Sequence, residues 1–235
     1  MTGESRSIWD RRARGSRGPA PERSLAEITA TAIAIADAGG LAAVSMRQVA
    51  TRLGTGPASL YRYVGGLGDL LDVMADTVTG QIDLSRPASG DWLGDMVTLV
   101  AEAKTVYLRH PWMVTLLSQR TPLGPNAIGY LESALTYLEQ SSADGGTKLE
   151  AIAIVSGLTR LFAAEELRAR DAPDDGRAAQ ESFLLRVAAD GKHPHLRAAL
   201  ETRGPQKGSE FRRTIRRVLI GMLTSDEEEP HPTRE

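Results

Sequence analysis

Hydrogen-bonding side chains gather in one short stretch of the sequence, "TGPASLYRY", which spans residues 55–63. Arg62 carries a planar fork of N–H donors that can bond both acceptors on the edge of a guanine base. Pro57 and Ala58 are small and apolar, so they can contact the methyl group of a thymine. The stretch therefore offers chemistry suited to base edges in the DNA major groove.

Residues that could do covalent or metal chemistry are few. The chain has no cysteine, which excludes disulfides and thiolate metal sites. His193 and His195 in "KHPHL" lack nearby acidic partners, so we expect a surface loop there and no metal site. The segment "RDAPDDG" lacks the DDxxD spacing of an all-α terpene-synthase-like enzyme, and no Ser-His-Asp elbow, P-loop or HExxH is present. We therefore expect no catalytic residues and no cofactor.

Charge is unevenly distributed along the chain. The net charge is −2, but nine arginines stand against five carboxylates up to Gly68, which gives +4 there and about −6 beyond. A basic end on an acidic body indicates a polyanionic partner at that end only. Five of the nine arginines lie in residues 1–20, where we expect a disordered basic arm. Whether this arm touches DNA stays open, since a disordered arm could also be silent.

Helices must hold the polar stretch in place, and the sequence predicts them. Apolar residues from position 25 to position 36 repeat at helical spacing before two glycines end the run. A second helix begins at Ser45, which forms a capping box with Gln48, and ends at Gly54. Pro57 begins a third helix of two turns, about residues 57–64, with Gly56 as its N-cap.

Two short helices joined by a glycine turn, and packed on a preceding helix, form a helix-turn-helix. Its second helix would project a free face into the major groove, made of Pro57, Ala58, Ser59, Tyr61, Arg62 and Tyr63. With a fourth helix near residues 68–82, this unit gives a predicted DNA-binding domain over residues 21–83.

The remainder also predicts helices, so we expect an all-α fold. They fall near residues 91–110, 111–120, 125–141, 147–171, 177–189 and 209–223. The predicted second domain spans residues 91–224, and an acidic tail at 225–235 is expected to be disordered. No apolar run approaches 18 residues and no signal peptide is evident, so we expect a cytoplasmic protein without a membrane partner.

Two stretches resemble a known family. "GGLAAVSMRQVATRLGTGPASLYRYV" followed by "GDLLDVMAD" resembles the DNA-binding domain of the TetR family of bacterial transcriptional repressors. "RHPWMVTLL…PLGPNA", within residues 109–127, resembles the C-terminal domain of the subgroup that contains the tetracycline repressor. The resemblance covers most of the chain. It implies an N-terminal helix-turn-helix domain and a C-terminal helical domain for ligand binding and dimerisation.

The resemblance also implies roles for individual residues. Arg47 would reach a base edge or a phosphate from the positioning helix, and Tyr61 and Tyr63 match positions that contact phosphates and sugars. The expected DNA-binding set is Ser45, Arg47, Gln48, Thr55, Pro57, Ala58, Ser59, Tyr61, Arg62 and Tyr63. Two positions depart from the family: Leu67 stands where a Lys or Arg usually grips a phosphate, and Gly56 stands where a Ser or Thr usually caps the reading helix.

In the C-terminal domain, the resemblance implies a dimer built from the helix at 147–171 and the last helix. The expected interface residues are Ala153, Ser156, Gly157, Ile215, Leu219 and Met222. Packing of these two helices within one subunit is the alternative. A dimer would also supply the two half-sites that a two-turn reading helix needs.

Aromatic residues with polar tips suit a small amphipathic organic effector. The candidates for ligand contact are Trp112, Leu116, Tyr130, Tyr137 and Phe162. Aromatic residues at helical spacing could also belong to the hydrophobic core. Arg160 could pair with an acidic ligand group, but a salt bridge to Glu165, Glu166 or another helix is the stronger expectation. The tetracycline repressor binds its drug–metal complex through a histidine whose matching region here, residues 116–120, contains none. This speaks against tetracycline–magnesium.

The expected function is that of a homodimeric repressor that binds a near-palindromic operator and is released by an effector. An activator, or a regulator of this fold that answers to no ligand, is the alternative. An all-α enzyme is the remote one.

Overall fold

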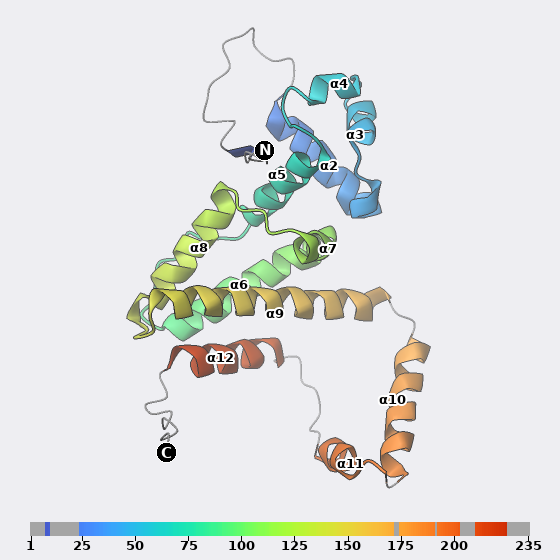
Figure 1. Cartoon of the computed structure of the whole chain (residues 1–235), viewed down its shortest axis with the longest axis vertical. Coiled ribbons are helices and arrows are strands. Elements are labelled where there is room, and N and C mark those ends of the chain that lie inside the picture. Colours follow the sequence, from blue (N-terminus) through green and yellow to red (C-terminus); the bar gives the residue numbers. More distant parts are fainter. Residues whose placement is uncertain (1–7, 10–23, 172–173, 191, 203–209, 225–235) are drawn as a thin grey trace, which may run out of the picture.

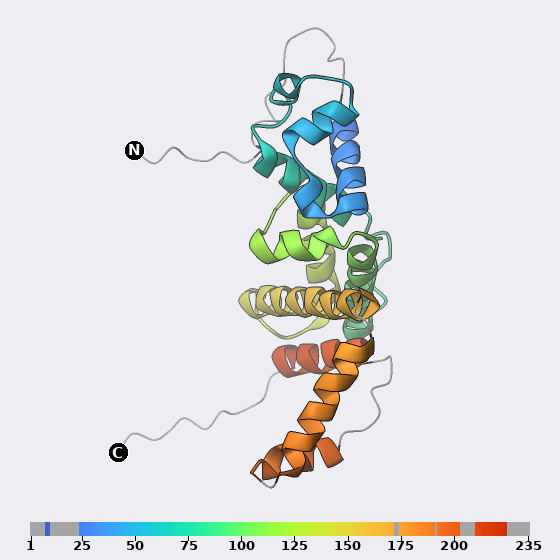
Figure 2. The same ribbon diagram turned by 90° about the vertical axis from the view of Figure 1, so that its right-hand side faces the viewer.

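The computed structural model describes residues 8–9, 24–171, 174–190, 192–202 and 210–224. Helices and turns make up these residues and no strand occurs among them, which confirms the all-α expectation. Figure 1 shows a small head, made of α2 to α5, above a body of longer helices. Figure 2 shows the same order from the side, with α7, α9 and α12 in successive layers below the head.

The head consists of α2 (Leu25–Gly39), α3 (Met46–Arg52), α4 (Pro57–Leu60) and α5 (Leu67–Thr79), with a 3-10 turn η1 (Leu41–Ala43) after α2. The helix starts follow from capping. Ser24 accepts a hydrogen bond from the N–H of Glu27, and Ser45 accepts one from the N–H of Gln48 at 3.1 Å. Four fully buried side chains join the head into one core: Ile28, Val49, Leu60 and Leu70.

A left-handed glycine makes the turn between α3 and α4. Gly54 has φ +66°, where a side chain would be strained. The N–H of Gly54 bonds the carbonyl of Thr51, and the N–H of Thr55 bonds that of Ala50 at 2.9 Å. This pair of bonds is the Schellman arrangement that closes a helix. After this turn the chain enters α4, whose first residue is Pro57.

The body consists of α6 (Trp92–Arg109), α7 (Trp112–Gln119), α8 (Pro125–Tyr137), α9 (Gly145–Asp171) and α12 (Glu210–Leu223), with a 3-10 turn η2 (Leu138–Gln140) after α8. The longest helix, α9, packs on α6 and α12. Two further helices, α10 (Asp174–Ala189) and α11 (Pro194–Glu201), extend to one side of the body in Figure 1.

The structure departs from the sequence prediction in three places. The reading helix is α-helical only over Pro57–Leu60, and residues 61–63 continue as a turn that brings buried Val64 back to the core. The segment predicted as a loop around "KHPHL" begins a helix, because Pro194 occupies the first turn of α11 with His193 as N-cap. Within the predicted arm, Ile8 and Trp9 are helical and Ile8 is buried. The other arm residues and the acidic tail lie outside the described residues.

Candidate DNA-binding and effector sites

The outer surface of α3 and α4 carries the residues predicted to meet DNA. Arg47 and Gln48 on α3 are exposed, as are Pro57 and Ala58 at the start of α4. Arg62 is exposed and Tyr61 keeps 54% of its surface in solvent. The opposite side of the unit is buried through Val49, Ala50 and Leu60, so the predicted contact residues share the free side.

Two predicted contact residues are engaged with each other. Ser59 Oγ donates to the carbonyl of Gly56 at 2.7 Å, and the hydroxyls of Thr55 and Ser59 lie 2.8 Å apart. Since the Ser59 proton is used on Gly56, the Thr55 hydroxyl must donate to Ser59. These hydrogen bonds stabilise the start of α4, where the N-cap residue Gly56 has no side chain to cap the helix.

Tyr63 differs from Tyr61. Its side chain packs against the core, and its hydroxyl is buried without a hydrogen-bond partner among the described residues. The guanidinium carbon of Arg62 lies 6.0 Å from the centroid of the Tyr63 ring. In this conformation the hydroxyl of Tyr63 does not present itself to a phosphate, whereas Tyr61 is free to do so.

Leu67, at the position where the family resemblance led us to expect a cation, begins α5 and is 37% exposed. Two residues later, Asp69 Oδ2 accepts a hydrogen bond from the N–H of Gly65 at 2.7 Å. The start of α5 therefore carries a carboxylate and no cation of its own.

A carboxylate at the end of α2 joins the head to the body. Asp37 Oδ1 accepts a 2.7 Å hydrogen bond from the indole N–H of Trp112, and His110 Nδ1 lies 2.7 Å from the same oxygen. His110 Nε2 lies 3.1 Å from Gln81 Oε1. Trp112, predicted to touch ligand, is 3% exposed and instead connects α7 to α2 of the head.

A second connection lies between α5 and α8. Asp76 is buried in α5, and its two carboxylate oxygens accept the backbone N–H groups of Asn126 and Ala127 in the first turn of α8. The side-chain amide of Asn126 also donates a 3.0 Å hydrogen bond to the Asp76 carboxylate. Beside it, Asp72 pairs with Arg120 at 2.9 Å. A carboxylate at a helix start is favoured by the free N–H groups and the helix dipole.

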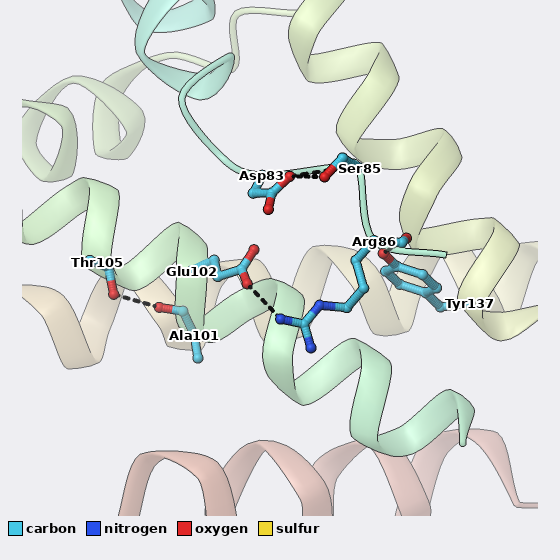
Figure 3. A network of polar contacts seen from close by, with 7 residues as sticks. All are labelled: Asp83, Ser85, Arg86, Ala101, Glu102, Thr105 and Tyr137. Carbon is cyan, nitrogen blue, oxygen red and sulfur yellow. Dashed lines mark hydrogen bonds and ion pairs between the residues drawn. The ribbon is translucent and has the colours of Figure 1, made fainter. Parts of the chain in front are cut away.

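Tyr137 and Leu116, two more ligand candidates, are buried in structural positions. The hydroxyl of Tyr137 donates to the carbonyl of Arg86 at 2.8 Å, in the linker between head and body. Figure 3 shows this linker, with Asp83 bonded to Ser85 and the guanidinium of Arg86 3.5 Å from Glu102 of α6. Burial also raises the pKa of the Tyr137 hydroxyl. Leu116 is fully buried core.

Tyr130 is the ligand candidate with the most distinctive surroundings. It lies on α8 and keeps part of its surface accessible, yet burial raises the pKa of its hydroxyl far above the usual value. Tyr107 of α6 raises it further, while the nearby Ser156 side chain opposes the rise. Burial also raises the pKa of Tyr107, and nearby Arg160 lowers it. Tyr107 was not among the ligand residues predicted from the sequence.

Phe162 and Arg160, both on α9, have different environments. The ring of Phe162 meets Phe211 of α12 edge-on at 5.4 Å, so it joins two helices of the body. Arg160 Nη1 donates to the carbonyl of Leu117 at 2.9 Å. The expected salt bridge of Arg160 is wrong for both neighbouring glutamates, because Glu166 pairs with Lys104 and Arg170 and Glu165 pairs with Arg168.

The structure corrects part of the predicted dimer set. Ile215 and Leu219 are fully buried within the subunit, so they have no surface left for a partner, and Ser156 is partly buried near Tyr130 of α8. Ala153 is exposed, while Gly157 and Met222 are partly so. The exposed apolar surface of α9 and α12 also includes Leu149, Ile154, Leu161 and Ile220, which sequence periodicity did not separate from the core.

Neither a membrane span nor a metal centre is found in the part of the chain that the structure describes. None of its helices combines the length and apolar character needed to cross a bilayer. No three His, Asp or Glu side chains within it gather closely enough to hold a metal ion.

A capped helix-turn-helix with an exposed polar face, carried on a helical body, defines a DNA-binding regulator. Residues 28–72 match the family described as "Bacterial regulatory proteins, tetR family", and residues 84–225 match "Tetracyclin repressor-like, C-terminal domain". The chain belongs to this TetR family of transcriptional regulators.

Individual relatives agree with this assignment. The chain is 35% identical over 226 residues to the HTH-type transcriptional repressor DrrR1 of Streptomyces coeruleorubidus, which covers 92% of this chain and 83% of that protein. Apo ActR from Streptomyces coelicolor superposes with a TM-score of 0.74 at 26% identity, over 88% of this chain and 98% of that one. ActR in complex with actinorhodin gives a TM-score of 0.73 at 25% identity, over 86% and 96%.

Proposed function

We propose that this chain is a homodimeric transcriptional repressor that binds a near-palindromic operator and is released by a small organic effector. The observation that carries the proposal is the α3–α4 unit, whose apolar side is buried while Arg47, Gln48 and Arg62 stand on its free side. This arrangement is how a helix-turn-helix presents its reading residues. In this reading the protein acts in the cytoplasm and is not an enzyme.

The DNA contacts divide by chemistry. Arg62 reads a guanine, Pro57 and Ala58 meet thymine methyl groups, and Arg47 with Gln48 fixes the unit from α3. Tyr61 holds a phosphate through its exposed hydroxyl. Ser45, Thr55 and Ser59 act through the geometry of the helix starts, because their hydroxyls are bonded locally.

The dimer forms through the exposed side of α9 and α12. Ala153, Gly157 and Leu161 follow one another at intervals of four residues, so they form one stripe along α9. Small residues in such a stripe let two helices approach closely. Two-fold symmetry then places two reading units one turn of DNA apart.

Effector release acts through the two connections between head and body. The ActR complex with actinorhodin shows that a relative of this fold holds a small molecule. A molecule held beside Tyr130 would bias the position of α8, whose first turn is bonded to Asp76 of α5. A shift of α5 would change the spacing of the reading units and so weaken operator binding.

Selection from random duplex DNA tests the proposal. The apo dimer should enrich a two-fold symmetric sequence and bind it at least about a thousandfold more tightly than random duplex at physiological salt. Arg62→Ala should relax the preference at one base pair in each half-site, whereas the exposed Arg197→Ala, on the remote helix α11, should leave it intact. Equal affinity for selected and random DNA would refute the proposal. A reporter assay separates repression from activation.

A further inference from the structure

Arg160 is a charged residue whose position the packing of the chain does not explain. It lies partly buried on α9, and the carbonyl of Leu117 takes a hydrogen bond from Nη1. No carboxylate pairs with its guanidinium among the described residues, because Glu165 and Glu166 pair with other cations. A guanidinium has five N–H donors, and a partly buried charge without a counter-ion is costly.

Hydroxyl groups surround the same place. Ser156 lies one helical turn before Arg160, so the two share a side of α9. The helices α6, α8 and α9 pack on one another. The Ser156 side chain lies near enough to Tyr130 of α8 to lower its pKa, and Tyr107 of α6 lies within electrostatic reach of both Tyr130 and Arg160. Three helices therefore bring three hydroxyls and one cation together, and each of these side chains keeps part of its surface accessible.

We propose that Arg160, Tyr107 and Tyr130 form a binding site for the ionised oxygen of an aromatic organic acid, either a carboxylate or an acidic phenol. Arg160 acts as the counter-ion, the two tyrosine hydroxyls donate hydrogen bonds, and their rings contact the aromatic body of the ligand. This names the ligand class of the effector site and rests on the proposed function. Both tyrosine hydroxyls are protonated at neutral pH, as in an ordinary tyrosine, and burial raises their pKa further, so they can donate.

Calorimetric titration of the full-length protein without DNA tests the site. The probes are anthraquinone-2-carboxylate, its uncharged carboxamide, and 1,2-dihydroxyanthraquinone, whose acidic phenol represents the second source of charge. At least one of the two acids should bind, and the carboxamide should bind roughly tenfold or more weakly than the carboxylate where that acid binds. The pH dependence of dihydroxyanthraquinone binding should follow its own ionisation if the phenol is recognised.

Substitutions then locate the charge. Arg160→Gln should weaken the binding acid by roughly tenfold or more and leave the carboxamide unchanged. Arg168→Gln, an exposed arginine on the same helix, should change neither. Tyr107→Phe should weaken the acid by a smaller factor. If circular dichroism shows that Arg160→Gln does not fold, the comparison of acid with carboxamide on the unaltered protein and on Tyr107→Phe decides.

The proposal is overturned if neither acid binds, if the carboxamide binds as tightly as the carboxylate, or if Arg160→Gln weakens acid and carboxamide equally. These results are distinct from failure of the proposed function. If the protein binds the acid without any loss of operator affinity, effector release is refuted while the anion site is supported. Operator release by a ligand that shows no dependence on Arg160 would refute the anion site alone.

Discussion

At the scale of single residues, the two tyrosines of the reading unit look equivalent in the sequence but have different environments in the structure. Tyr61 and Tyr63 are two positions apart, so a continuous helix would turn them about 200° from each other. Tyr61 is exposed, while the hydroxyl of Tyr63 is buried without a partner in the described structure. An unsatisfied buried hydroxyl costs stability, so Tyr63 has the geometry of a core residue with an unused polar group.

Matched removal of the two hydroxyls tests this division. Tyr61→Phe should weaken operator binding about fivefold for every operator sequence, because a phosphate contact carries no sequence information. Tyr63→Phe should leave operator affinity within about twofold and raise the free energy of unfolding by about 1 kcal/mol. Fluorescence anisotropy and urea unfolding measure the two effects. A large loss of affinity in Tyr63→Phe would mean that this hydroxyl turns outward on DNA.

The sequence could predict α3, its cap and the turn after it, because Ser45 and Gly54 act through local backbone chemistry. It could not predict the roles of Trp112 and Tyr137. Both stand on apolar helix faces, and only the tertiary fold brings them to Asp37 and to the linker carbonyl of Arg86. The sequence shows that Arg160 interrupts an apolar helix face. It does not show that Arg160 has no carboxylate partner, because this depends on the tertiary contact that pairs Glu166 with Lys104.

At the scale of elements, α8 depends on a cap that comes from another helix. Asp76 of α5 satisfies the first N–H groups of α8, for which Gly124 offers no side chain. Asp76→Ala should lower the free energy of unfolding by about 2–3 kcal/mol, since the charge-assisted bonds from the N–H groups of α8 to this buried carboxylate are lost. Urea unfolding measures this. Glu132→Ala, on the exposed side of α8, should change it by less than about 0.5 kcal/mol. Equal effects would contradict the role of Asp76.

The pair between α6 and α9 gives the protein an acid-sensitive contact. The hydrogen bond from Lys104 Nζ, 2.5 Å from Glu166 Oε2, holds the pKa of this carboxyl below its usual range, and Arg170 adds to the effect. A carboxyl with a lowered pKa in the folded state stabilises the fold above its unfolded pKa, and the contribution is lost as pH falls through the folded value.

Glu166→Gln should therefore cost stability near neutral pH and less in acid. Because the pair is partly exposed, we expect a loss of only about 0.5–1 kcal/mol at pH 7, which should shrink below about pH 4. Unfolding by urea at a series of pH values measures this. Glu165→Gln, whose carboxylate pairs at the surface with Arg168, provides the comparison. A loss independent of pH would show that packing and not charge is responsible.

At the scale of the whole molecule, the proposed dimer uses the exposed stripe of α9. Leu161 is 51% exposed there, and Leu123 is 56% exposed in the loop before α8. Leu161→Glu should shift the protein from dimer to monomer in sedimentation experiments and abolish operator binding, because a charge would be buried in the interface. Leu123→Glu should remain a dimer with normal affinity. A dimeric Leu161→Glu would place the interface elsewhere.

The shared cap at Asp76 also bears on how the molecule melts. The matched families divide the chain between residues 72 and 84, yet the α8 start cannot keep its bonds once α5 unravels. Head and body should consequently lose structure in a single calorimetric transition, with the calorimetric enthalpy equal to the van't Hoff enthalpy once dimer dissociation is included. We therefore expect the helix-turn-helix head and the body to form one thermodynamic unit. An effector that stabilises the body will raise the melting temperature of the reader by the same linkage.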